Sequence, residues 1–192
     1  MLLGILINAL IGVVTLIVCW KAQKRYFTTL SNLFSALVAL LLMALEIGLM
    51  AKGGGMADLP RWAVVLKYVA TVSVAVTFLT VMVFLGPIYG YKSQLEGTGA
   101  WVHAAGPILA ILVFGLLEKG IRLSAGEALL GLLPTLIYGI YYLYMVIVKT
   151  EKKGGWEDFY AFNRGGKWPI SFSAMVLGTG LICLLLSLLH NA

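Results

Sequence analysis

The sequence predicts an all-α fold, a single six-helix transmembrane bundle that takes in residues 1–192. Its composition gives the first reason: 61% of the residues are hydrophobic and 11% are charged, whereas soluble domains carry about 25% charged residues. Apolar runs of about 17 to 25 residues, long enough to cross a hydrocarbon core, give the second. Tryptophans at the ends of four runs, as in the aromatic belts of membrane proteins, give the third. A water-soluble fold is excluded.

Each span corresponds to one apolar run, in chain order. The first begins beside Met1, with no basic segment or cleavage site before Trp20, so we expect a retained helix and not a signal peptide. The second and third each hold one charged residue. The fourth and fifth contain Pro107 and Pro134, which predict a bend or a local cavity. The six spans cover residues 2–20, 30–50, 62–86, 101–117, 128–148 and 169–189.

The basic residues predict the orientation of the bundle. Six spans place both termini on one side of the membrane. The loops after spans one, three and five hold nine Lys and Arg residues, and the opposite side holds five, Lys67 included. Because basic loops stay in the cytoplasm, we expect these three loops inside and both termini outside. The charges are spread over three short loops, which argues against nucleic-acid binding.

Polar residues inside the spans are expensive in lipid and therefore indicate function or internal pairing. Glu46 and Lys67 lie at similar depth in neighbouring spans, roughly 7 Å from their outer ends. The sequence favours a structural ion pair between them over a proton or ion pathway. Cys19 and Cys183 lie in apolar runs without metal-ligand spacing, so neither a disulfide nor a metal site is expected.

Hydroxyl-bearing side chains in spans three and five leave two interpretations open. Ser73 and Thr77 share one helical face, which serves either helix packing, the favoured reading, or substrate contact. Tyr138 and Tyr142 can point inward together and either line a cavity or fill the core.

A polar cluster at the start of span two carries the strongest local signal. Thr28, Ser31 and Asn32 lie on one helical face, and the simplest interpretation of Thr28 is an N-cap. His103 lies near the start of span four on the same side of the membrane. A histidine at a helix end is more often an interface residue than a catalytic one. Asp158 lies in a loop on that side too. A hydroxyl, an imidazole and a carboxylate at one level are the groups needed for nucleophilic acyl transfer.

These residues resemble a known family. The pattern Tyr26-Phe27-Thr28-Thr29-x-Ser31-Asn32, the isolated His103 before Pro107, and Asp158-Phe159-Tyr160 are similar to bacterial members of the androgen-induced membrane protein family. That family includes the androgen-dependent regulator of tissue factor pathway inhibitor, and the resemblance extends over essentially the whole chain. Its animal members are threonine hydrolases that cleave fatty acid esters of hydroxy fatty acids.

The resemblance implies a lipid-ester hydrolase in a bacterial inner membrane. Thr28 would be the nucleophile and His103 the general base, with Thr29 and Asn32 as catalytic support. A shift of the match by one residue would make Thr29 the nucleophile instead. Asp158 would either orient the histidine or be an ordinary loop acid. The expected reaction needs no cofactor, and its substrate comes from the bilayer, as do the lipids around the bundle. Acyl chains would lie against Ser31, Ser73, Thr77, Tyr138 and Tyr142.

Two other functions remain open. A small transporter or channel built on the same polar face would depend on Glu46 or Lys67 more than on Thr28. A non-catalytic membrane regulator would keep the fold without the chemistry. The sequence predicts no oligomeric state.

Overall fold

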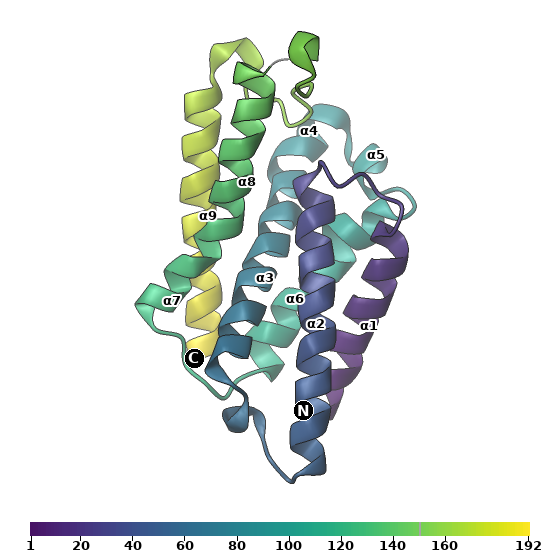
Figure 1. Cartoon of the computed structure of the whole chain (residues 1–192), viewed down its shortest axis with the longest axis vertical. Helices are drawn as coiled ribbons and strands as arrows, with labels where there is room; N and C mark the ends of the chain where they lie inside the picture. The colour runs from purple at the N-terminus through teal and green to yellow at the C-terminus, as the bar shows by residue number, and fades with distance from the viewer. Residues whose placement is uncertain (150) are drawn as a thin grey trace.

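The computed structural model describes residues 1–149 and 151–192, and this part of the chain contains helices and no strand. Figure 1 shows α3 in the middle of the bundle, with α1 and α2 on one side and α8 and α9 on the other. The α-helices are α1 (Leu2–Cys19), α2 (Phe27–Ala51), α3 (Arg61–Leu79), α4 (Gly86–Tyr89), α5 (Tyr91–Leu95), α6 (Gly106–Leu112), α7 (Ala125–Leu129), α8 (Leu133–Leu143) and α9 (Trp168–Asn191).

Tighter or wider helical turns extend several of these helices. Wider π-helical turns form η2 (Thr80–Leu85), η3 (Trp101–Ala105), η4 (Val113–Leu117) and η6 (Tyr144–Val148). Short 3₁₀ turns form η1 (Met56–Asp58), η5 (Leu130–Leu132), η7 (Glu151–Lys153) and η8 (Arg164–Gly166). Pro107 and Pro134 mark changes of helical type: each lies in the first turn of an α-helix that follows η3 or η5. Proline has no N–H to donate to the preceding turn, so the regular pattern of helical hydrogen bonds is interrupted there.

The all-α fold is confirmed for the described residues, and five of their helical stretches are long and apolar enough to cross a membrane. They cover Leu2–Cys19, Phe27–Ala51, Arg61–Tyr89, Ala125–Val148 and Trp168–Asn191. The predicted fourth span is a shorter apolar helix, Trp101–Leu117. At 1.5 Å per residue its length is about 25 Å, somewhat less than a typical hydrocarbon core.

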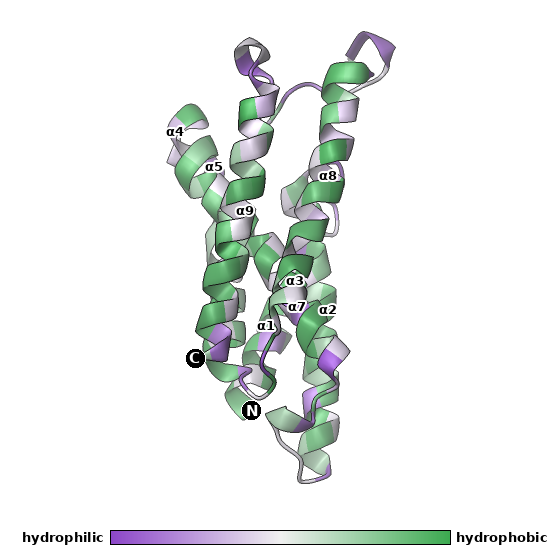
Figure 2. Cartoon of the chain, turned by 90° about the vertical axis from the view of Figure 1, so that its left-hand side faces the viewer, coloured by the Kyte–Doolittle hydropathy of each residue, from purple (hydrophilic) through white to green (hydrophobic). Residues whose placement is uncertain are grey.

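The outer surface of the bundle is apolar. Large side chains such as Ile17, Val83 and Leu177 are more than two-thirds exposed. Figure 2 shows hydrophobic colour along most of the helices and hydrophilic colour mainly in the turns at the two ends. Soluble monomers rarely expose apolar patches larger than a few hundred Å², so this surface suits contact with lipid.

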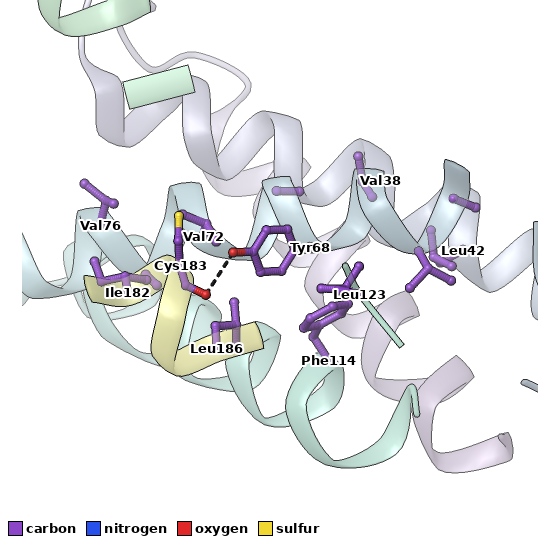
Figure 3. Packing of buried hydrophobic residues seen from close by; sticks show 14 of the residues in the cluster. Val38, Leu42, Tyr68, Val72, Val76, Phe114, Leu123, Ile182, Cys183 and Leu186 are labelled. Atoms are coloured by element: carbon purple, nitrogen blue, oxygen red, sulfur yellow. Dashed lines mark hydrogen bonds between the residues drawn. The ribbon is translucent and has the colours of Figure 1, made fainter. Parts of the chain in front are cut away.

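The main core packs α3 against its neighbours around Tyr68, which is fully buried. Its hydroxyl lies 2.9 Å from the Ala128 carbonyl and 3.0 Å from the Cys183 carbonyl, so α3, α7 and α9 meet at one phenol. Figure 3 shows Tyr68 between Phe114 and Cys183, with the bond to Cys183 dashed. Gly131 allows this approach, because a Cβ there would lie 2.7 Å from the Cys183 sulfur.

The structure corrects the predicted partner of Lys67. Its ammonium lies 3.6 Å from Oε1 of Glu118, at the end of η4, and donates a hydrogen bond to Asn8. Glu46 is fully buried but has no hydrogen-bond partner for either oxygen among the described residues. Glu118, and not Glu46, therefore holds the position that faces the ammonium.

Candidate active site at the start of α2

An apolar cavity of about 500 Å³ lies between α3, η2, α8 and α9 and reaches the first turn of α2. Thr28 lies on its wall, whereas Thr29 is buried elsewhere and does not line it. The structure therefore separates two threonines that are adjacent in sequence. The wall of the cavity also includes Thr77, Thr80, Thr135, Tyr138, Tyr142, Tyr160 and Gly178.

One side of the cavity is formed by residues on the outer surface of the bundle. Leu79, Val83 and Phe84 come from the end of α3 and from η2, and Leu181 and Leu185 come from α9; all five are exposed. In a bilayer these positions face acyl chains. The cavity thus lies beside the exposed apolar surface of the bundle, with Thr28 on its wall.

The first turn of α2 is capped by a tyrosine from a distant loop and not by a threonine. Tyr26 is the N-cap residue and makes no side-chain cap, so the N-cap interpretation of Thr28 is wrong. The Phe27 N–H donates to the Tyr160 hydroxyl at 2.9 Å. The Leu30 N–H donates to the Tyr26 carbonyl at 3.1 Å. Helix geometry leaves the amides of Thr28 and Thr29 without intrahelical acceptors.

Tyr160 is a neutral hydrogen-bond donor at this site. Burial raises the pKa of its phenol, and hydrogen bonding with Thr28 acts in the opposite direction. The hydroxyl already accepts from Phe27, so its own proton is free to be donated. The neighbouring Ala161 adopts a left-handed conformation (φ 53°), which is uncommon without glycine and marks a constrained turn.

His103 lies in η3, with its tautomer fixed by a backbone carbonyl. Nδ1 is 2.6 Å from the Gln94 carbonyl, which can only accept, so a neutral ring carries its proton on Nδ1. The lone pair is then on Nε2, as a general base requires. Gly99 makes this bond possible, because a Cβ there would lie 2.3 Å from the same carbonyl oxygen.

Asn32 connects the two segments that carry Thr28 and His103. Its amide donates to the Thr28 carbonyl at 2.8 Å and to the Val102 carbonyl at 3.0 Å. The first turn of α2 is thereby joined to the residue beside His103. In residues 1–149 and 151–192 no hydrogen bond joins the Thr28 hydroxyl to the imidazole, and His103 is not among the cavity-lining residues.

Asp158 does not contact His103 but organises its own loop. Oδ1 accepts from the Tyr142 hydroxyl at 2.8 Å and from the Phe162 amide at 2.9 Å, and Oδ2 accepts from the Asn163 amide at 2.7 Å. The Tyr142 hydroxyl also accepts from the Tyr160 amide at 3.0 Å. The carboxylate therefore holds Tyr160 in place, and Nδ1 of His103 has Gln94 as its partner instead.

The remaining predicted substrate contacts divide into two groups. Thr77, Tyr138 and Tyr142 line the cavity. Ser31 does not, but it shares a hydrogen bond of 2.8 Å with Thr77. Ser73 bonds the Val69 carbonyl at 2.8 Å, as helix packing predicts.

Sequence reasoning missed two polar groups at the cavity. Tyr160 was noted only as part of a loop motif. Thr135 lines the cavity, and its hydroxyl is buried and has no hydrogen-bond partner among the described residues. In the sequence, Thr135 could have been found as the one hydroxyl-bearing residue beside Pro134 in an otherwise apolar run. An unpaired buried hydroxyl favours a ligand that brings a polar atom.

Comparison with protein-family models, curated proteins and solved structures finds no match to this chain.

Proposed function

We propose that this protein is an intramembrane hydrolase of lipid carboxylic esters, with Thr28 as nucleophile and His103 as general base. The observation that carries the proposal is the position of Thr28, at a helix N-terminus and on the wall of an apolar cavity. In this proposal six helices cross a bacterial inner membrane, with the Thr28 end of α2 at the cytoplasmic side. The short motifs that resemble the androgen-induced membrane protein family support the same assignment.

The proposed reaction has two steps. Oγ of Thr28 attacks the ester carbonyl carbon while Nε2 of His103 takes its proton, giving a tetrahedral oxyanion. The C–O bond to the alcohol breaks, the alcohol leaves with the proton from Nε2, and an acyl-threonine remains. Water, deprotonated by Nε2, then attacks the acyl carbon and releases the fatty acid and the Thr28 hydroxyl.

Donors for the oxyanion are available around Thr28. The unbonded amides of the first turn of α2 and the positive end of its helix dipole favour negative charge there. The Tyr160 phenol, held by Phe27 and by the Asp158 loop, adds a neutral O–H. Preorganised donors of this kind are usually the largest single contribution to acyl-transfer catalysis.

The distance between Thr28 and His103 is expected to shorten when substrate binds. Asn32 holds the two backbone segments together, and catalytic hydrogen bonds are often long or unformed in a free enzyme. The π-helical form of η3 fits this role, because such turns occur frequently at functional sites.

A fluorophosphonate probe tests the proposal directly. Purified protein in detergent or nanodiscs is labelled, digested and analysed by mass spectrometry, with Thr29→Ala as a matched variant. We expect an adduct on Thr28 in both proteins, and loss of labelling when long-chain esters compete. An adduct on Thr29, or no adduct on a protein that hydrolyses esters, would contradict the assignment.

Replacing His103 with glutamine is expected to lower kcat for ester hydrolysis by about 10² to 10⁴, the usual contribution of a general base. Glutamine keeps a polar side chain near Gln94 but supplies no titratable nitrogen. Hydrolysis rates are measured across pH in both proteins. The wild type should lose activity as its imidazole is protonated at low pH, and the residual activity of His103→Gln should lack that limb. A matching limb in the variant would assign the base elsewhere.

Filling the cavity is expected to select against long acyl chains. Gly178 is exposed at the cavity wall on α9, and a Cβ there meets no atom within 4 Å. Gly178→Phe should therefore fold and should lower kcat/KM for long-chain esters by about tenfold or more. Short-chain esters should be affected less, and Gly178→Ala should resemble the wild type. Equal losses for both chain lengths would show that the acyl chain lies elsewhere.

A further inference from the structure

A second buried polar cluster lies at the other end of α2 from Thr28. Glu46 is about 27 Å from Thr28 along the helix axis, at 1.5 Å per residue. The cluster consists of Glu46 from α2, Asn8 from α1, Lys67 from α3 and Glu118, which follows η4. All four side chains are buried, and the proposed hydrolysis uses none of them.

Three members of this cluster form a closed hydrogen-bonded group. The Asn8 amide donates to Oε1 of Glu118 at 2.6 Å, and its oxygen accepts from the Lys67 ammonium. Lys67 also lies 3.6 Å from the same Oε1 of Glu118. One ammonium is thus neutralised by one carboxylate, with an amide between them. The second carboxylate oxygen of Glu118 has no partner among the described residues.

Glu46 adds a second carboxylate next to this neutral group. A Cβ on Gly4 would lie 3.8 Å from Oε2 of Glu46, and Gly4 is one helical turn from Asn8 on the same face of α1. Glu46 is 0% exposed, and both of its oxygens lack partners in the part of the chain that the structure describes. Lys67, Glu118 and the amino group of Met1 lie within electrostatic range of it.

The other titratable side chain against η4 is His190, on α9. Its ring stacks on Phe114 at 4.2 Å, and its two nitrogens lie 3.0 and 2.9 Å from the carbonyls of Phe114 and Ile121. Both carbonyls can only accept, so a neutral imidazole, which carries one N–H, donates to one of them and a protonated ring donates to both. Among the described residues no hydrogen bond joins His190 to the Glu46 carboxylate.

Charge balance decides what the cluster binds. The four buried side chains include two carboxylates and one ammonium, and the amino group of Met1 belongs to a residue that is only partly buried. With both carboxylates ionised, the buried side chains would carry one net negative charge in an apolar interior, which costs several kcal/mol unless it is neutralised. Among the described residues no group of three His, Cys, Asp or Glu side chains is arranged to hold a metal ion. A single proton neutralises the charge and turns Glu46 into a donor. Oε2 of Glu118 is an unpaired acceptor in the same cluster.

We propose that Glu46 is a proton-binding site, on which the folded bundle takes up one proton from the medium beside the Asn8–Lys67–Glu118 group. The proton adds to one carboxylate oxygen and no other bond changes. The site is independent of Thr28 and of the ester chemistry.

Infrared spectroscopy of the purified protein tests this site. In wild type at neutral pH we expect the carbonyl band of a protonated carboxylic acid, lost in Glu46→Gln and unchanged in Glu157→Gln, an exposed loop control. In Glu118→Gln the band should also be lost, because Glu46 then becomes the counterion of Lys67. Absence of the band in wild type, or its survival in Glu46→Gln, overturns the proposal.

Stability gives a second readout. If the folded state binds one proton more than the unfolded state, stability falls as pH rises. The unfolded Glu46 ionises in the usual carboxyl range while the folded one keeps its proton. The Tm of wild type in detergent should therefore decrease from about pH 5 to neutral pH more steeply than that of Glu46→Gln. Exchange of sodium for choline at constant ionic strength should leave both values unchanged. A Tm that rises with sodium and is flat with pH would assign a sodium site and overturn the proton site.

Discussion

Thr28→Ala is expected to lower ester hydrolysis by on the order of 10⁴-fold, since removal of a nucleophile leaves only binding and oxyanion stabilisation. The protein should still fold, because the cap of α2 is the bond from the Phe27 N–H to the Tyr160 hydroxyl, which does not need the Thr28 side chain. Turnover is measured with purified protein and long-chain esters of hydroxy fatty acids, and folding by Tm in the same detergent.

Three variants separate the nucleophile from a structural effect at Thr28. Thr28→Ser keeps a hydroxyl and should retain measurable turnover. Thr80→Ala removes a hydroxyl from the same cavity, and Thr29→Ala removes one from the adjacent residue that does not line it. Both should keep most of the activity. If Thr28→Ala hydrolyses esters as fast as Thr80→Ala does, Thr28 is not the nucleophile, and a transporter or a regulator becomes the better hypothesis.

The helical architecture followed from the sequence because apolar length and composition are strong signals. Five of the six runs correspond to helices long enough to cross a membrane. The fourth run, from Trp101 to Leu117, was harder to judge. Its two π-helical turns are not encoded by an apolar pattern, because the same side chains fit an α-helix or a wider turn. At Pro107 and Pro134, where the sequence predicts a bend or a local cavity, the structure shows changes of helical type.

The candidate site was predictable only in part, for a geometric reason. Span order and parity bring Thr28, His103 and Asp158 to one end of the bundle, but they do not say which groups touch. Asp158 binds Tyr142 and its own loop, and His103 binds Gln94, because a chain reversal lies between Gln94 and His103. Tyr160 caps α2 from a position far along the chain. Contacts of that kind depend on how loops fold back, which helical periodicity does not encode.

The same limit explains the error at Lys67. Depth in the membrane follows from counting residues, and it placed Glu46 and Lys67 at the same level. The direction in which each side chain points around its helix depends on how the helices are rotated against each other. Glu118 lies one residue beyond the predicted fourth span, but its side chain is buried and its carboxylate lies 3.6 Å from the Lys67 ammonium.

Lys67→Met is expected to destabilise the protein by about 3 to 5 kcal/mol, the usual cost of removing one partner from a buried ion pair. Methionine fills a similar volume, so the loss comes from charge and not from a cavity. Glu118 would keep only the Asn8 amide as a donor among the described residues, with Glu46 as a second carboxylate nearby. Reversible unfolding in mixed detergent measures the difference from wild type.

A double variant decides whether the ion pair itself is responsible for that loss. Lys67→Met combined with Glu118→Gln removes both charges, and a buried pair replaced as a whole often costs little. The double variant should therefore be more stable than Lys67→Met alone. Lys119→Met, which removes an exposed lysine next to Glu118, should change stability by no more than about 0.5 kcal/mol. If the double variant is as unstable as Lys67→Met, then the Lys67 ammonium stabilises the bundle through Asn8 or Glu46, and the Lys67–Glu118 pair is not the main contribution.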